Sequence, residues 1–152
     1  MSLFIQSFNV ATVSAVDVTL DPGTDLWYPQ KWTAIKIKGY HTCLSFYAVY
    51  SVKYPCGLMY VGQTTRQIKD RIWEHKSDIK RNVRQNPMAC HFVDTGHTVA
   101  QPRFQILQHI PILRRGGDRA KQLLKCEAGW IRRLGTITPG GLNKEYELNS
   151  LI

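Results

Sequence analysis

Residues 50–79 read YSVKYPCGLMYVGQTTRQIKDRIWEHKSDI, and this stretch decides the fold that the sequence predicts. A run of β-branched and aromatic residues over positions 45–53 stops at the Pro-Cys-Gly of positions 55–57. A second run follows at once over positions 58–61. Two runs of this kind on either side of a tight turn are typical of a β-hairpin. The two strands are therefore expected to be antiparallel neighbours.

A helix is expected directly after the hairpin, over positions 65–83. Gly62 ends the second strand, and Thr64 and Gln67 match the N-cap and third positions of a capping box. The apolar face of this helix is marked by residues at helical spacing, Ile68, Ile72, Ile79 and Val83.

The rest of the chain adds elements of both kinds. A short strand is expected over positions 33–39, a short helix over positions 87–92 and another strand over positions 103–110. Asp118 and Gly135 occupy the N-cap and C′ positions of a long last helix between them. Together these elements predict a small mixed α/β domain.

Composition narrows the class of protein. The 152 residues suffice for one domain, and a hydrophobic fraction of 43% excludes a disordered chain. No apolar run approaches the roughly 18 residues of a membrane-spanning helix, and the pattern of a secretory signal is absent from the N-terminus. The four cysteines fit free thiols or metal ligands better than disulfides.

Charge is unevenly distributed along the chain. Positions 1–30 contain three Asp and no Lys or Arg, whereas the remaining positions contain all 20 Lys and Arg and only 8 of the 11 Asp and Glu. A basic body of this kind indicates a polyanionic partner, nucleic acid before membrane. A solvated basic surface is the alternative.

Glu127 is the most informative position of the last helix. It lies four residues from Leu123 and four from Ile131, on the apolar face. A carboxylate on a buried face needs a cation, because burying it unpaired is costly. That cation is either an Arg or Lys in a structural salt bridge or a metal ion.

Two pairs of polar side chains also have regular spacing. Arg71 and His75 are four residues apart and are expected on one helix face beside the isoleucine stripe. An Arg suits phosphate oxygens and a His titrates near neutrality, with a plain solvated face as the alternative. Tyr50 and Tyr60 lie on the two hairpin strands, where core packing is the alternative to a functional role.

These positions together resemble the pattern of the GIY-YIG endonuclease family. The two motifs appear as Ala48-Val49-Tyr50 and Tyr60-Val61-Gly62, followed in order by Arg71, His75, Glu127 and Asn143. The closer likeness is to the GIY-YIG domain of Penelope-like retroelement proteins. It is carried by residues 50–79, by RRGGDRAKQLLKCEAGWI at 114–131 and by LGTITPGGLN at 134–143.

The resemblance implies a fold and its boundaries. The expected fold is a small α/β (α+β) domain with a three-stranded antiparallel sheet flanked by helices, over positions 46–146. An N-terminal arm (1–34) and a lead-in segment (35–45) precede it, and a tail (147–152) follows.

The resemblance also implies metal-dependent hydrolysis of a DNA phosphodiester. Glu127 would bind one Mg²⁺ or Mn²⁺, and Arg71 would bind the phosphate in the transition state. One of the two tyrosines would activate the nucleophile with His75 as its proton partner, and Asn143 would tie the C-terminal segment to the site. The implied catalytic residues are Tyr50, Tyr60, Arg71, His75, Glu127 and Asn143.

DNA binding is expected along the first helix. Basic side chains there would contact backbone phosphates with little sequence selectivity. These residues are Lys69, Lys76, Lys80, Arg81 and Arg84.

The sequence departs from the family in Gln63, where many members have Lys, and in Ala48-Val49, where the family has Gly-Ile.

A structural zinc site is a further implication of the Penelope-type likeness. Its four ligand positions match Tyr54, Cys56, His91 and His97. Three zinc ligands remain (Cys56, His91 and His97), whereas a structural site normally has four. The alternative is that Cys56 and Cys90 are ordinary small buried residues, as free cysteines often are.

The expected function is therefore a nicking DNA endonuclease of a Penelope-like retroelement or its remnant. The free 3′-hydroxyl left by the nick would prime the reverse transcriptase of the parent element, a partner absent from this chain. DNA is the expected partner, no membrane is expected, and the nucleus is the expected location. The alternatives are a catalytically inactive DNA-binding module derived from such an element and a purely structural zinc module.

Overall fold

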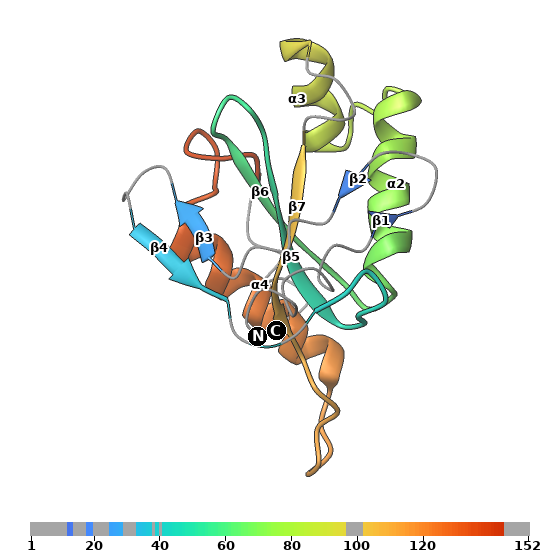
Figure 1. Cartoon of the computed structure of the whole chain (residues 1–152), viewed down its shortest axis with the longest axis vertical. Coiled ribbons are helices and arrows are strands. Elements are labelled where there is room, and N and C mark those ends of the chain that lie inside the picture. Colours follow the sequence, from blue (N-terminus) through green and yellow to red (C-terminus); the bar gives the residue numbers. More distant parts are fainter. Residues whose placement is uncertain are drawn as a thin grey trace, which may run out of the picture.

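The computed structural model describes residues 12–13, 18–19, 25–28, 33–37, 39, 41–96 and 102–144. Within them six strands come first along the chain, followed by two helices, a seventh strand and a last helix (Figure 1). The strands are β1 (Thr12–Val13), β2 (Val18–Thr19), β3 (Asp25–Tyr28), β4 (Thr33–Lys36), β5 (Ala48–Lys53), β6 (Met59–Thr64) and β7 (Arg103–His109). The helices are α2 (Ile68–Lys80), α3 (Pro87–Thr95) and α4 (Arg119–Leu134).

The central sheet has the order β6-β5-β7, and both pairings are antiparallel. Helices α2 and α3 cover one face, where their apolar side chains pack against Tyr50, Val52 and Phe104. Helix α4 covers the other face, where Leu123 and Ile131 pack with Val49, Val61 and Leu107. The predicted α+β fold with a three-stranded antiparallel sheet between helices is confirmed.

Helix α2 is shorter than the predicted helix over positions 65–83, and the predicted capping box is wrong. Thr64 is the last residue of β6, paired with Ala48 of β5, and the N-cap is Gln67, whose side chain makes no capping hydrogen bond. The backbone carbonyls of Ser45 and Cys43 accept instead from Ile68 and Lys69 at 3.1 and 2.9 Å. The preceding segment thus takes over the capping role of a side chain.

The other helix ends follow their local sequence signals. Asn86 caps α3 by accepting from the Met88 N–H at 2.9 Å, and Gly96 ends it with a left-handed conformation. The Asp118 side chain accepts from the Lys121 N–H at 3.0 Å at the start of α4, and Gly135 ends that helix in the left-handed region.

The strand expected over positions 33–39 corresponds to β4, which pairs with β3 in a separate two-stranded sheet. This hairpin begins inside the segment assigned to the N-terminal arm, so the boundary at 34/35 falls within β4. No helix of the described ranges has the length and apolar character needed to cross a membrane.

Asn143 fastens the C-terminal segment to the outer edge of β6. Its Oδ1 accepts from the Val61 N–H at 2.9 Å, and its Nδ2 donates to the Val61 carbonyl at 2.8 Å. The Thr136 hydroxyl donates to the same Oδ1 at 2.7 Å. The side-chain amide therefore satisfies both backbone groups of a fully buried residue on an edge strand, as a neighbouring strand would.

Replacing Asn143 should destabilise the fold strongly. Asn143→Ala leaves the buried N–H and C=O of Val61 without these partners, which should lower the free energy of unfolding by about 2–4 kcal/mol. Urea unfolding followed by tryptophan fluorescence measures this, with the exposed neighbour substitution Lys144→Ala as control. A loss below about 0.5 kcal/mol for Asn143→Ala would contradict the fastening role.

Candidate active site

The site begins with a close contact between the two motif strands. Tyr50 of β5 pairs directly with Gly62 of β6. A Cβ atom at Gly62 would lie 2.6 Å from the Tyr50 hydroxyl oxygen and 2.9 Å from Cε1 of Tyr60. The phenol of Tyr50 therefore crosses its neighbouring strand at a point where only a glycine leaves room. This is the physical reason for the glycine of the second motif.

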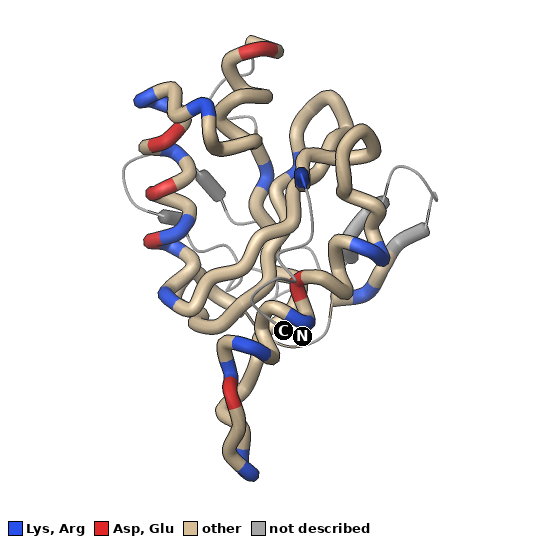
Figure 2. The backbone as a smooth tube through the Cα atoms, turned by 180° about the vertical axis from the view of Figure 1, so that it is seen from behind, with Lys and Arg blue, Asp and Glu red and all other residues tan. Residues whose placement is uncertain are grey.

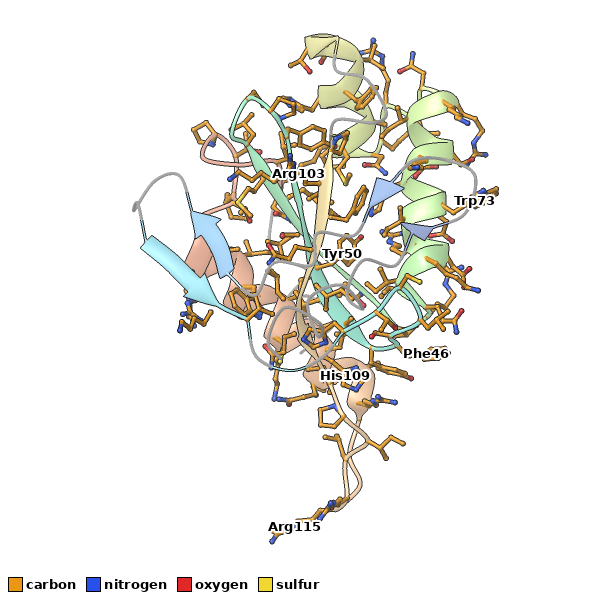
Figure 3. The ribbon with its side chains drawn as sticks, viewed as in Figure 1. Phe46, Tyr50, Trp73, Arg103, His109 and Arg115 are labelled. Atoms are coloured by element: carbon orange, nitrogen blue, oxygen red, sulfur yellow. The ribbon has the colours of Figure 1, made fainter. Side chains whose placement is uncertain are left out.

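Helix α2 supplies two partners to the Tyr50 hydroxyl. His75 Nε2 lies 2.5 Å from this oxygen, and Arg71 Nε donates to it at 3.2 Å. The two side chains are four residues apart and so project from one side of α2 toward the sheet. Figure 3 places Tyr50 at the centre of the molecule, between the sheet and α2.

His75 is buried, with 1% of its surface exposed, so it does not lie beside the isoleucine stripe as expected, nor on the solvated face that was the alternative. It is three residues after Ile72 and four before Ile79, which places it within the stripe. The ring of Tyr60 meets it edge-on at 5.9 Å between centroids. The prediction that Arg71 and His75 share one face is confirmed, and the position of that face is corrected.

Burial and then the charge of Arg71 lower the pKa of His75 to about 3. The imidazole is therefore neutral at physiological pH, and its Nδ1 is buried without a hydrogen-bond partner among the described residues. Burial is also the main reason why the pKa of Tyr50 is raised. Tyr60 and Glu127 raise it further and Arg71 opposes them. Tyr50 is thus a protonated phenol beside an uncharged imidazole.

Arg71 is fixed by a carboxylate on the same helix. Its Nη1 donates to Glu74 Oε2 at 2.9 Å, and the other oxygen of Glu74 pairs with Arg66. Burial alone would lower the pKa of Arg71, but Tyr50 and Glu74 raise it above its ordinary value. Glu74 was not among the predicted site residues. Its position three residues after Arg71 is the signal that would have found it.

Glu127 lies on α4, in the layer on the other side of the sheet, and is 5% exposed. Its charge contributes to the raised pKa of Tyr50, so the carboxylate and the phenol act on each other electrostatically. Carboxylate oxygen is the donor that Mg²⁺ and Mn²⁺ prefer, and Mg²⁺ is commonly bound by one or two carboxylates with water and phosphate completing its shell. A single buried carboxylate therefore fits such an ion. The described residues contain no cluster of three or more metal-ligating side chains.

The predicted DNA-binding residues do not form one exposed basic face. Lys76 is 5% exposed, because it follows Ile72 by four residues and points inward, so its assignment to a phosphate-binding face is wrong. Lys69 is half-buried and Lys80 is exposed. Acidic and basic positions alternate along α2 (Figure 2).

The last two residues of that group lie beyond α2. The exposed side chains of Arg81 and Arg84 each pair with a carboxylate, Asp78 at 3.1 Å and Asp94 at 3.6 Å. Those acidic partners offset the two positive charges, so they weaken the case for phosphate binding at this end of the helix.

The candidate zinc ligands are partly brought together. Cys56 Sγ lies 3.3 Å from His91 Nε2, and the Tyr54 ring packs against the His91 ring at 4.9 Å between centroids. His97 lies outside the described residues. Two adjacent ligands do not complete a tetrahedral site, so structural zinc stays a prediction that depends on His97.

The chain was compared with family models, curated proteins and solved structures, and it matches none of them. A function can therefore be inferred only from the geometry of the site and from the sequence motifs.

A methyl group at Gly62 should displace Tyr50. Gly62→Ala forces a Cβ into the phenol, which should cost about 1–3 kcal/mol of unfolding free energy. Gly129 of α4 has no atom within 4 Å of its ideal Cβ, so Gly129→Ala should be neutral or stabilising in the same urea titration. Equal stabilities for the two variants would contradict the contact.

The buried imidazole makes stability depend on pH. Between its ordinary pKa of 6.5 and the folded value of about 3, the unfolded chain binds a proton that the folded chain excludes. The free energy of unfolding should therefore fall as the pH drops through this window, by up to about 1.4 kcal/mol per pH unit from this residue.

The substitution His75→Gln removes this titration and isolates its contribution. The difference in unfolding free energy between wild type and variant should shrink by roughly 2 kcal/mol between pH 7.5 and pH 5. Urea unfolding at several pH values measures it. A difference that stays constant with pH would show that His75 is not held neutral by burial.

Proposed function

We propose that this chain is a metal-dependent DNA endonuclease of the GIY-YIG type that nicks DNA by phosphodiester hydrolysis. The observation that supports it best is the Tyr50 hydroxyl, buried between the acceptor nitrogen of a neutral imidazole and a guanidinium. A purely structural tyrosine needs one partner for its hydroxyl. Here the partners are a proton acceptor and a permanent cation, the two groups that a hydrolytic site needs around a nucleophile and a phosphate.

Tyr50 and His75 form a proton relay in this proposal. A water molecule that attacks the phosphorus gives its proton to the Tyr50 oxygen, while the Tyr50 proton passes to His75 Nε2 over the 2.5 Å contact. Burial and Arg71 make His75 a weak base in the free protein, and the negative charge of a bound phosphate would raise its pKa for this step. The Tyr50 hydroxyl reaches His75 Nε2 directly, whereas Tyr60 meets His75 ring to ring, so the activation of the nucleophile is assigned to Tyr50. Arg71 Nε donates to the Tyr50 oxygen, so the hydroxyl proton is directed at the Nε2 lone pair of neutral His75, whose ring proton is then on Nδ1.

Arg71 binds the phosphate. Glu74 occupies one of its terminal nitrogens and Tyr50 its Nε, which leaves donors of the fork for a phosphate oxygen. Charge that builds on the phosphate oxygens in the transition state is then met by a preorganised cation. A divalent cation bound by Glu127 would supply Lewis-acid polarisation of the scissile phosphate and would stabilise the leaving 3′ oxygen.

The retroelement assignment belongs to the same proposal and rests on the sequence likeness alone. A nick that leaves a 3′-hydroxyl would serve the reverse transcriptase of a Penelope-like element, which implies work in the nucleus.

Nicking of supercoiled plasmid with Mg²⁺ or Mn²⁺ tests the proposal. Tyr50→Phe removes one oxygen and should slow nicking about 100-fold or more, while duplex binding measured by fluorescence polarisation stays unchanged. Glu127→Gln and Arg71→Ala should abolish nicking. Tyr54→Phe, a second buried tyrosine of the same strand region, is the matched control and should nick at the wild-type rate.

Two results would count against the proposal. If the wild type binds duplex DNA but never nicks it with either ion, the chain is a DNA-binding module without turnover. If Tyr50→Phe nicks as fast as the wild type, the relay is wrong even though the chain is a nuclease.

A further inference from the structure

The connection between β7 and α4 projects from the body of the domain as a narrow arm. We call residues 111–117 the arginine arm. Figure 1 shows this connection extending beyond the end of α4, and Figure 3 places Arg115 at its far tip. The proposed nuclease chemistry makes no use of it.

The base of the arginine arm is pinned to the sheet. The Arg119 guanidinium donates to the Ile110 carbonyl from Nε at 3.0 Å and from Nη2 at 2.6 Å. The same group stacks on the Tyr47 ring, 3.9 Å from its centroid, and the Ile110 N–H donates to the Tyr47 carbonyl at 2.8 Å. Asp118, the acidic residue next to the arm, is engaged as the N-cap of α4. Both ends of the arm are therefore fixed, which directs its tip away from the domain.

The tip is a β-turn with two arginines at its centre. The Gly116 N–H donates to the Leu113 carbonyl at 3.2 Å, so Arg114 and Arg115 are the two central residues of a four-residue turn. Gly116 has a φ of 76° and Gly117 a φ of 110°, conformations that glycine adopts without strain. Leu113 packs back across the arm, 3.5 Å from the ideal Cβ position of Gly117. The sequence thus builds a compact hairpin-like tip that presents two guanidinium groups.

The charge of the tip is not neutralised within the described part of the chain. Arg114 and Arg115 are exposed and take part in none of its ion pairs, unlike Arg81 and Arg84. Ile112 on the same arm is 79% exposed, the most exposed large apolar side chain among the described residues. Two free guanidinium groups beside an exposed apolar side chain on a slender arm match the chemistry of a narrow anionic groove with apolar walls.

We propose that the arginine arm enters the minor groove of duplex DNA, with Arg114 and Arg115 in the groove and Ile112 against its wall or a base step. The minor groove is about 6 Å wide and has enhanced negative potential in A·T-rich tracts, which attracts inserted arginines. Apolar side chains are used as wedges at such contacts. DNA is also the substrate in the proposed function, and this inference rests on it to that extent. It adds a second anchoring point at a distance from the phosphate-binding Arg71.

Duplex binding without divalent metal tests the arm separately from catalysis. Fluorescence polarisation with a labelled 25-base-pair duplex in EDTA would compare the wild type with Arg114→Ala/Arg115→Ala. The variant should bind at least 10-fold more weakly near 0.1 M salt, and the slope of log K against log salt should fall by about 2. Arg132→Ala/Arg133→Ala removes the same charge from the exposed end of α4 and should change affinity less than 3-fold.

Groove and base composition give a second readout. Binding of the wild type should be competed by a minor-groove dye and should favour an A·T-rich over a G·C-rich duplex by several-fold. Arg114→Lys/Arg115→Lys keeps the charge but should lose that preference, because Lys is the more strongly hydrated cation and is less suited to the narrow groove. Circular dichroism should be the same for all variants, since the arm lies outside the core.

Each contrary outcome is distinct. If Arg114→Ala/Arg115→Ala and Arg132→Ala/Arg133→Ala lose the same affinity for the duplex, the loss is a general effect of charge and the DNA-binding role of the arginine arm is wrong. Binding that the minor-groove dye does not compete would overturn the groove assignment. Binding of the wild type to anionic lipid vesicles but not to duplex would replace DNA with a membrane. If the arginine arm binds DNA as proposed but the wild type does not nick it, the nuclease proposal is wrong while the DNA-binding role of the arm is supported.

Discussion

The crossing of Tyr50 over Gly62 is the contact on which the rest of the site depends. It joins the two hairpin strands at one register position, and it points the phenol toward α2 instead of along the sheet. His75 and Arg71 reach the same oxygen only because the phenol is there. A β-bulge in the β5–β7 pairing falls between Val49 and Tyr50, at the place where the strand changes register before the tyrosine. Among the described strand pairs of this sheet, the shift of register therefore lies next to Tyr50, while the pairing of β5 with β6 is regular.

A polar network of buried and partly exposed groups holds the side chains of the candidate site. Neutral His75 and protonated Tyr50 are enclosed by rings and by the isoleucines of α2, so their hydrogen bond is made in a medium of low polarity, whereas Arg71 is partly exposed. Glu74 completes the group, since its two oxygens pair with Arg71 of α2 and with Arg66 of the preceding connection. Such a network is costly if one partner is missing, which favours a single arrangement of all of them.

Sequence patterns predicted the elements whose signals are local. Asp118 and Gly135 are caps that act through their own side chain or backbone, and α4 lies between them as expected. The short helix expected over positions 87–92 begins at Pro87 as predicted and continues to Thr95. The predicted start of α2 was wrong. The first N–H groups of this helix are capped by the carbonyls of residues 43 and 45, and no local sequence pattern reveals such a cap.

The residues of the candidate site were predicted from the order of the motifs, whereas their protonation states and the contact of Glu74 with Arg71 became clear only from the packing. Lys76 was predicted to bind phosphates at the surface and His75 to lie beside the isoleucine stripe, although their spacing from Ile72 and Ile79 puts both on the buried side. Strand β4 was predicted, but its partner β3 was not. The four residues of β3, Asp25–Tyr28, are too few to show the alternation of polar and apolar positions that the longer segment over positions 33–39 shows.

The candidate site is assembled from two parts of the chain that become available at different times during synthesis. The part that contains Tyr50, Gly62, Arg71 and His75 lies within a contiguous hairpin and helix between residues 48 and 80. Glu127 and Asn143, whose side chain holds the C-terminal segment to β6, lie in the last third of the sequence. On a ribosome the hairpin and α2 emerge first and make mostly short-range contacts, which form fast. The carboxylate joins only when α4 docks on the opposite face of the sheet, so completion of the site coincides with completion of the fold.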